Sequence, residues 1–249
     1  MLLQFSSESL HVFDGTLHDL GRFAPERPAF VPRTGEGDLA ALLESVSSRR
    51  ALARGQELFC QGEPALHAFR VAGGAIRLFR LLPDGRRHVV DFLVAGDYYG
   101  FFASRSFACT AQAMSGSVVL QYRRRAIEGL IERHPTIGST LLAPATRELS
   151  STEDRLMLLG RMTAIERLAA FLLAIARRRG GGKRSEIDLF MTRTDIADYL
   201  GLTTETVSRC MTRLRQEGII RQANPARVVM LRREALERLA EGCGDDMDD

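Results

Sequence analysis

The sequence lacks several features that define common protein classes. No apolar run approaches the roughly 20 residues that a membrane-spanning helix needs. Met1–Leu10 has neither the basic flank nor the long apolar core of a secretory signal. The cysteines lie far apart without a Cys-x-x-Cys pair, so no disulfide framework and no zinc or iron–sulfur cage is evident; they are Cys60, Cys109, Cys210 and Cys243. We therefore expect a cytoplasmic protein with no membrane partner, no bound metal and no cofactor.

Lysine is also scarce, because Lys183 is the only cationic side chain that is not an arginine. Codon composition alone would explain the preference for arginine over lysine. Arguments from charge concern binding partners and not the fold. The net charge is only +3, but Arg161–Glu241 holds 16 arginine or lysine residues against 10 acidic ones, about +6. Four aspartates within 245–249 then add four negative charges, which offset most of this positive charge. A basic C-terminal third is compatible with a nucleic-acid partner but does not establish one.

Glycines divide residues 50–122 into short segments of alternating character. A chain of 249 residues, 45% hydrophobic and 26% charged, has an ordinary globular balance for one large domain or two small ones. Pro83-Asp84-Gly85 is a tight-turn signal. The punctuating glycines are 11 or 12 residues apart: Gly62, Gly73–Gly74, Gly85 and Gly96. Short strands at this spacing predict an antiparallel sandwich or barrel.

Helical periodicity precedes and follows this region. We expect helices over residues 38–48, 125–133 and 164–179, and a longer helix that ends near Gly160, with Pro144 at its start or at a kink. The longer helix carries an apolar stripe at heptad spacing, typical of a helix that pairs with a second copy; the stripe includes Leu142, Leu149, Thr152, Leu156 and Leu159. A helix packed on its own β domain would show the same stripe, so both alternatives stay open.

The run Met191–Arg215 predicts two helices joined by a glycine turn. Thr192, followed three residues later by Asp195, resembles a capping box and starts the first helix. That helix breaks at Gly201, and Thr203 is a good N-cap for the next helix. The pattern is that of a helix-turn-helix, followed by a basic β-hairpin around Asn224-Pro225 that would form a wing.

The second helix has an apolar face and a polar face. Val207, Met211 and Leu214 must point inward, and the opposite face carries a base-reading trio, Glu205, Ser208 and Arg209. A helix fits the major groove of DNA, where arginine donates to guanine, glutamate accepts from cytosine and serine bonds a base or a phosphate. We assign backbone contacts to Thr192, Arg193, Thr203, Thr204 and Arg213. An ordinary helical hairpin with surface charges is the alternative interpretation.

Cys210 follows Arg209 on the same predicted helix. Oxidation of its thiol would disturb DNA binding, which makes Cys210 a candidate for redox control. Its position leans toward the apolar face, however, and an inert packed thiol fits the pattern as well.

The run from Thr192 to Arg209 resembles the Crp–Fnr family of bacterial transcription regulators, and within it the FixK-like and Fnr-like branch. The resemblance covers nearly all of residues 50–235, with further similar stretches at 84–87, 95–100, 111–113 and 158–161. It implies a homodimeric regulator that works with RNA polymerase, as an activator, in oxygen limitation or in the response to nitrogen oxides. The residues themselves leave activation and repression open. It also implies that Glu205, Ser208 and Arg209 read a TTGA-N6-TCAA-like palindrome.

The implied fold class is α+β, with an antiparallel β-roll similar to cyclic-nucleotide-binding domains, a long dimerisation helix and a winged helix-turn-helix. The expected divisions of the chain are an extension (1–37), the β-roll sensor domain (38–125), helices that include the dimerisation helix (126–160), the DNA-binding domain (161–240) and an acidic tail (241–249).

Departures from the family pattern reduce the number of candidate ligands that the β-roll could sense. Relatives that bind cyclic AMP hold the phosphate with an Arg-Ser pair, but Arg105-Ser106 lies out of register and residues 107–110 occupy the aligned stretch. Thr152-Glu153 places a carboxylate where those relatives meet the purine. No cysteine precedes Cys60, so the Fnr-type cluster is not expected. Haem on His67 or His88, and a sensor whose ligand is a cyclic nucleotide, are alternatives. The departures favour a FixK-like regulator whose signal is its own abundance and not a ligand.

No pattern of an enzyme stands out. The sequence shows no Ser/His/Asp set, no phosphate-binding loop and no paired carboxylate motif. We expect a regulator that is not an enzyme.

Overall fold

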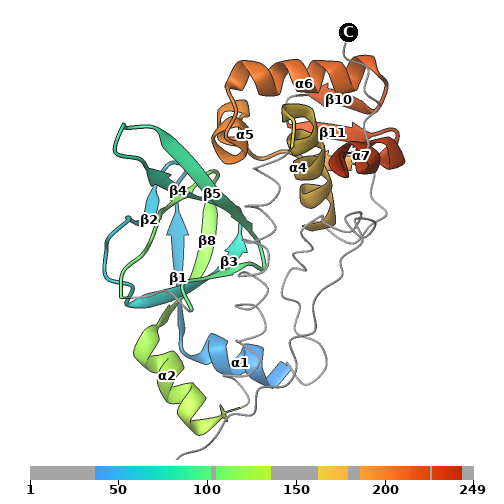
Figure 1. Ribbon diagram of the computed structural model, residues 1–249. Coiled ribbons are helices and arrows are strands. Elements are labelled where there is room, and N and C mark those ends of the chain that lie inside the picture. Colours follow the sequence, from blue (N-terminus) through green and yellow to red (C-terminus); the bar gives the residue numbers. More distant parts are fainter. Residues whose placement is uncertain (1–36, 102–104, 136–161, 179–185, 225, 243–249) are drawn as a thin grey trace, which may run out of the picture.

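The computed structural model describes residues 37–101, 105–135, 162–178, 186–224 and 226–242. These residues form a β domain flanked by two helices and a smaller, mostly helical domain beside it (Figure 1). The stripe residues Leu142, Leu149, Thr152, Leu156 and Leu159 lie outside the described residues, as do 1–36 and 243–249. Within the five described ranges, no helix combines the length and the apolar character that a membrane crossing requires.

The β domain consists of two four-stranded antiparallel sheets. Their strands are β1 (Ser47–Leu52), β2 (Glu57–Phe59), β3 (His67–Gly73), β4 (Ala75–Leu81), β5 (Arg87–Val94), β6 (Tyr98–Tyr99), β7 (Thr110–Ala113) and β8 (Ser117–Arg123). One sheet has the order β1-β8-β3-β6 and the other β2-β7-β4-β5. Buried side chains from both sheets, such as Val71 of β3 and Leu78 of β4, fill the space between them. The sequence prediction of an antiparallel β-roll is confirmed.

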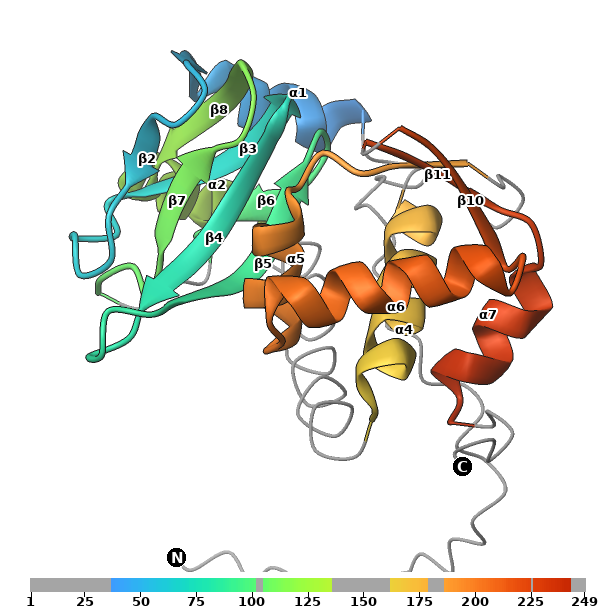
Figure 2. The ribbon, with the colours of Figure 1, turned by 90° about the horizontal axis from the view of Figure 1, so that it is seen from above.

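Strands β4 and β5 form a long hairpin that projects from the second sheet (Figure 2). Their register runs from Ala75 opposite Val94 to Leu81 opposite Arg87. The turn closes where the Gly85 amide donates to the carbonyl of Leu82 at 2.9 Å. Gly85 has φ +82°, a conformation that glycine adopts without steric cost. The turn predicted at Pro83-Asp84-Gly85 is therefore present.

Two helices cover one end of the β domain. They are α1 (Gly37–Ser45) and α2 (Arg124–Arg133), and Leu43, Tyr122 and Ile127 pack together beneath them. The sequence predicted that the first helix continues to residue 48, which is wrong. The chain enters β1 at Ser47 because Ser47 to Leu52 pair in register with β8, and this ladder satisfies their backbone groups.

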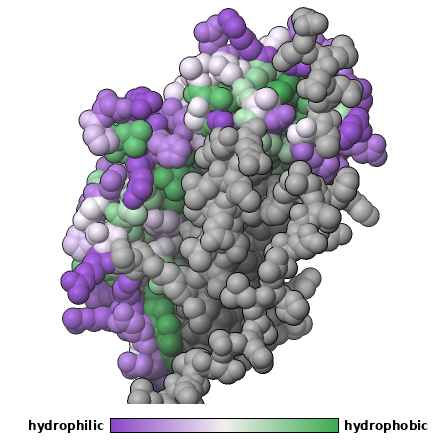
Figure 3. Space-filling model, viewed as in Figure 1, coloured by the Kyte–Doolittle hydropathy of each residue, from purple (hydrophilic) through white to green (hydrophobic). Residues whose placement is uncertain are grey.

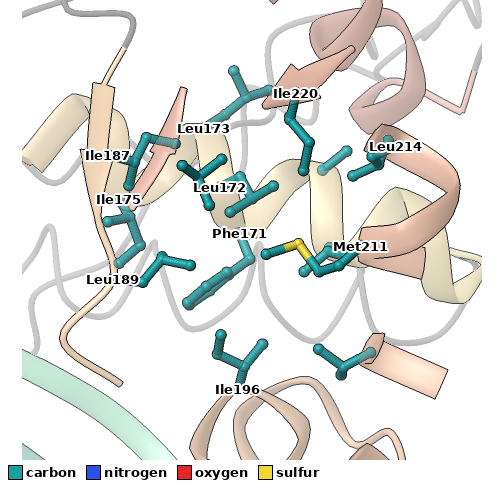
Figure 4. Packing of buried hydrophobic residues seen from close by; sticks show 14 of the residues in the cluster. Phe171, Leu172, Leu173, Ile175, Ile187, Leu189, Ile196, Met211, Leu214 and Ile220 are labelled. Carbon is teal, nitrogen blue, oxygen red and sulfur yellow. The ribbon is translucent and has the colours of Figure 1, made fainter. Parts of the chain in front are cut away.

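The C-terminal domain combines four helices with a small antiparallel sheet. Its elements are α4 (Ala164–Arg178), β9 (Glu186–Asp188), α5 (Arg193–Leu200), α6 (Thr204–Gln216), β10 (Ile220–Asn224), β11 (Arg227–Met230) and α7 (Arg233–Ala240). Strand β11 lies between β10 and β9. Apolar side chains from α4, α6 and β10, among them Phe171, Met211 and Ile220, meet in one cluster (Figure 4). The predicted helix-turn-helix and wing hairpin are present. Strand β9 was not predicted, because three residues are too few for a periodic signal.

The two domains share an apolar contact. Phe92 of β5 is fully buried and belongs to the cluster of the C-terminal domain rather than to the core of the sheets. Its ring centroid lies 5.4 Å from that of Tyr199 on α5 and 6.4 Å from that of Phe171 on α4. Figure 2 shows α5 beside β5 accordingly. The β4–β5 hairpin is therefore the surface on which the C-terminal domain packs.

Gly74 gives a test of the tight connection between β3 and β4. It has φ +82°, and an added Cβ would lie 2.7 Å from the carbonyl oxygen of Gly116. The left-handed conformation alone costs a side chain roughly 1–2 kcal/mol, and the clash adds to it. We expect Gly74→Ala to lower the free energy of unfolding by about 3 kcal/mol, measured by urea denaturation.

Gly85→Ala is the matched control, because Gly85 has the same φ but nothing within 4 Å of an added Cβ. It should cost only the backbone strain, about 1–2 kcal/mol. Equal losses for the two variants would contradict the steric argument.

Candidate nucleic-acid interface

The first helix of the helix-turn-helix begins with a complete capping box. The Thr192 hydroxyl accepts a hydrogen bond from the Asp195 amide at 3.1 Å, and the Asp195 carboxylate accepts one from the Thr192 amide at 3.1 Å. Helix α5 ends at Gly201, which adopts a left-handed conformation with φ +64°. Both signals were predicted from the sequence and are confirmed. They fix where the chain turns, and therefore where the second helix starts.

The second helix presents its two faces as expected. The Thr203 hydroxyl caps α6 by accepting from the Thr206 amide at 3.1 Å. Val207, Met211 and Leu214 are buried in the cluster against α4. Since the apolar face is used completely for packing, the polar face is left on the surface. Figure 3 shows hydrophilic residues along the outer edge of the molecule, where α6 lies.

The base-reading trio is exposed near the start of α6. The Arg209 guanidinium donates to the Glu205 carboxylate at 2.6 Å, and the two side chains are 79% and 72% exposed. The exposed Ser208 donates its hydroxyl proton to the Thr204 carbonyl at 2.8 Å, which leaves its oxygen free to accept. Glu205 thus holds the guanidinium of Arg209 from one turn away, as the sequence spacing predicted.

The residues expected to contact the DNA backbone fall into two groups. Thr192, Thr203 and Thr204 are exposed at the N-termini of α5 and α6, where backbone N–H groups and the helix dipole favour anions. Arg213 is exposed as well, although it donates to Glu217 at 2.7 Å.

Arg193 differs, because its guanidinium is half-buried and faces the wing. Its Nη2 donates to the Gln222 side chain on β10 at 2.9 Å, and its Nη1 is buried without a hydrogen-bond partner. Burial, and next the charge of Arg215, lower the pKa of Arg193. As placed, Arg193 ties α5 to the wing instead of projecting into solvent. The sequence pattern held no sign of this contact, which spans 29 positions.

The wing carries further arginines on its exposed side. Arg221 lies on β10 and Arg227 on β11, and Arg227 also donates to Asp188 on β9 at 3.2 Å. This bond joins the unpredicted strand to the hairpin. The surface around α6 is therefore bordered by cations that suit phosphate groups.

Cys210 is partly buried against the apolar cluster. Burial raises the pKa of its thiol. Thiols that act as redox sensors have a lowered pKa and good access to solvent. The geometry therefore favours the packed-thiol alternative over redox control.

Asp195 has a second role that the sequence did not predict. Besides its part in the capping box, its carboxylate accepts hydrogen bonds from Arg77 on β4 and Arg87 on β5, at 2.6 and 3.0 Å. Burial by itself would raise the pKa of Asp195, but the bonds from Thr192 and the charge of Arg77 lower it overall. These contacts join residues more than 100 positions apart, so a local sequence pattern cannot predict them.

Comparisons with known proteins agree with this geometry. Residues 166–239 match the Crp-like helix-turn-helix domain, and residues 49–134 match the cyclic nucleotide-binding domain. The nitrogen fixation regulation protein FixK of Rhizobium meliloti is 38% identical over 185 residues, which cover 74% of this chain and 83% of that protein. This chain belongs to the Crp/Fnr family, in its FixK-like branch.

Two further similarities extend over most of the chain. The transcriptional activator protein FnrL of Cereibacter sphaeroides is 32% identical over 246 residues, which cover 96% of this chain and 98% of that protein. The structure of FixK2 from Bradyrhizobium japonicum matches with a TM-score of 0.74 and 35% identity, over 78% of this chain and 97% of that chain. These relatives are named as regulators, and the chain is a DNA-binding transcription regulator of the same family.

The β domain of this Crp/Fnr protein has aromatic side chains in its interior. Phe107 stacks on Phe59 with ring centroids 3.8 Å apart, and Tyr99 stacks on Phe59 at 5.5 Å. Arg105 and Ser106 are exposed on the surface. The stack of Phe59, Phe107 and Tyr99 thus fills part of the described interior of the β domain.

Stability measurements will separate the exposed residues of α6 from the folding core. Glu205→Ala removes an exposed i,i+4 ion pair, and such pairs contribute about 0.3–0.5 kcal/mol. We expect the free energy of unfolding to fall by no more than that amount in urea titrations.

Leu214→Ala on the buried face of the same helix is the contrasting variant. It should cost about 2–5 kcal/mol, because it leaves a cavity in the cluster. A loss above about 1 kcal/mol for Glu205→Ala would mean that the trio also supports the fold.

Proposed function

We propose that the protein acts as a homodimer that binds a TTGA-N6-TCAA-like palindrome and activates transcription with RNA polymerase. The observation that carries the proposal is the exposed trio of Glu205, Ser208 and Arg209 at the start of α6, with Arg209 already held by Glu205. The start of a recognition helix is the part that reaches base edges in the major groove.

Each member of the trio has a distinct task in this proposal. Arg209 donates to O6 and N7 of the guanine in TTGA, which is the commonest specific contact in protein–DNA complexes. Glu205 accepts from the amino group of the cytosine on the opposite strand and keeps the guanidinium aligned. Ser208, whose oxygen remains free to accept, bonds a base amino group.

Backbone contacts orient this helix in the groove. The exposed caps Thr192 and Thr203, together with Thr204, direct two helix N-termini toward phosphates, while Arg213 and the wing arginines add charge. Arg193 would reach a phosphate only by leaving Gln222. Contacts of this kind set affinity and register but carry no sequence information.

Dimerisation follows from the symmetry of such a site. A helix-turn-helix protein reads two half-sites about one helical turn apart, so two copies of α6 must be held at that spacing. The heptad stripe of Leu142, Leu149, Thr152, Leu156 and Leu159 is the segment that we assign to this pairing.

The proposal also includes the physiological signal to which the protein responds. We assign the protein to gene control in oxygen limitation or in the response to nitrogen oxides, without cyclic AMP or an Fnr-type cluster. Its similarity to the FixK and FnrL regulators supports the control of transcription, and the signal itself is our assignment. A genome-wide footprint in cells grown with and without oxygen would identify the operator and the regulated genes together.

Base selectivity provides the direct test of the trio. Fluorescence anisotropy with a TTGA-N6-TCAA duplex should show tight binding, and Arg209→Ala should cost about 1–3 kcal/mol and relax the preference at the guanine. Equal affinity of the unmodified protein for a scrambled duplex would disprove the proposal.

Thr192→Ala is the comparison that separates backbone from base contacts. It removes the cap that fixes the N-terminus of α5, which we expect to face the phosphates, so binding should weaken by a similar factor for every duplex. A loss restricted to the TTGA duplex would show that the contacts have been assigned wrongly.

Assembly is tested by sedimentation. Leu149→Glu combined with Leu156→Glu places charges in the heptad stripe and should convert the dimer to monomers, with a loss of palindrome binding of roughly tenfold or more. Leu66→Glu is the control, because Leu66 is 65% exposed in the β domain. A double variant that still sediments as a dimer would rule out this stripe as the interface.

A further inference from the structure

Four charged side chains join the β domain to the helix-turn-helix. We call Arg77, Arg87, Asp195 and Asp198 the interdomain ion cluster. Arg77 Nη1 lies 2.6 Å from Asp195 Oδ1, and Arg87 Nη2 lies 3.0 Å from the same oxygen and 2.7 Å from Asp198 Oδ2. Both arginines come from the β4–β5 hairpin and both aspartates from α5.

The cluster is shielded from solvent. Asp195 is 1% exposed, and the side chains of Arg77 and Arg87 are 22% and 24% exposed. Attraction between charges is much stronger in such a site than on the surface, whereas an isolated buried carboxylate is strongly disfavoured. Asp195 in this buried position therefore requires the two arginines, and removal of their charges would leave its carboxylate buried without a cation.

The arginines are themselves held from the side of the β domain. Arg77 donates through Nε to Gln112 on β7 at 3.0 Å, and a second guanidinium nitrogen bonds the same oxygen. The guanidinium groups of Arg77 and Arg87 lie 5.7 and 5.9 Å from the centre of the Phe79 ring. The hairpin thus presents two positioned cations, next to the apolar contact that Phe92 makes with α4 and α5.

On the other side, Asp195 divides its two oxygens between two tasks. Oδ2 accepts from the hydroxyl and the amide of Thr192, and so completes the start of α5. Oδ1 accepts from Arg77 and Arg87. One carboxylate therefore fixes the N-terminus of α5 and attaches that terminus to the β domain.

We propose that Arg77 and Arg87 are positioning residues for DNA binding. They hold α5, and α6 with it, in an orientation that leaves Glu205, Ser208 and Arg209 exposed. Domains of one chain move relative to one another unless their interface is large and hydrophobic, and here the ion cluster adds to the apolar contact of Phe92. A fixed orientation lowers the entropic cost of binding two half-sites together. The proposal rests on the dimer and the palindrome proposed above.

The matched variants lie on one hairpin. Arg77→Met with Arg87→Met keeps the side-chain stems but removes the charges that cross to α5. Arg80→Met with Arg86→Met is the control, because these arginines bond Ala108 and Asp84 within the β domain. We expect the first pair to weaken palindrome binding roughly tenfold, a usual size for coupling between sites, and the control to stay within about twofold of the unmodified protein.

A duplex with a single TTGA half-site separates positioning from loss of fold. Only one helix-turn-helix engages it, so the fixed spacing gives no advantage. The Arg77→Met/Arg87→Met variant should bind this duplex within about twofold of the unmodified protein. Equal losses on the half-site and the palindrome would overturn the positioning role.

Hydrogen exchange without DNA tests the docking independently of the proposed operator. Peptides from β5 and α5 should exchange faster in the Arg77→Met/Arg87→Met variant than in the control, because the shared interface opens. If the unmodified protein showed no preference for the palindrome, the proposed function would fail while this measurement still decided whether the domains are held by the cluster.

Charge reversal completes the test. Arg87→Asp alone brings three carboxylates together and should weaken palindrome binding, and Arg87→Asp with Asp198→Arg should restore most of it. Palindrome binding and exchange that are unchanged in Arg77→Met/Arg87→Met, or tighter palindrome binding by that variant, would overturn the proposal.

Discussion

The arrangement of this protein depends on one buried carboxylate, that of Asp195. A negative charge that is 1% exposed is tolerated only where hydrogen bonds and cations surround it. Thr192 supplies the hydrogen bonds from α5 itself, and Arg77 and Arg87 supply the cations from the β4–β5 hairpin. The start of the helix-turn-helix and its attachment to the β domain are therefore consequences of the same electrostatic requirement.

The surface that we propose to face DNA arises from the opposite arrangement. Helix α6 is held by its apolar face, where Val207, Met211 and Leu214 are buried, and not by its charges. Glu205 and Arg209 are consequently free to exchange their mutual ion pair for contacts with a base. Stability and the proposed recognition are therefore located on different faces of one helix, so each can vary without the other.

The β domain combines the architecture of a known domain family with an aromatic interior. Its two sheets match the cyclic nucleotide-binding domain, yet Phe107 stacks on Phe59 inside and Arg105 is on the surface. Function resides in particular side chains and not in the architecture that carries them. In this chain the hairpin of that architecture serves as the platform on which the DNA-binding domain packs.

The sequence by itself determined the elements whose signals are local. The capping pair Thr192 and Asp195, the turn at Gly201 and the period of the apolar residues predicted both helices and the exposed trio, because each depends on neighbours within a few positions. Only the tertiary structure decided that Asp195 meets Arg77, 118 residues away, and that Arg193 turns toward the wing. Such contacts depend on how elements that are distant in the sequence pack together. The spacing of residues along the chain contains no information on that packing.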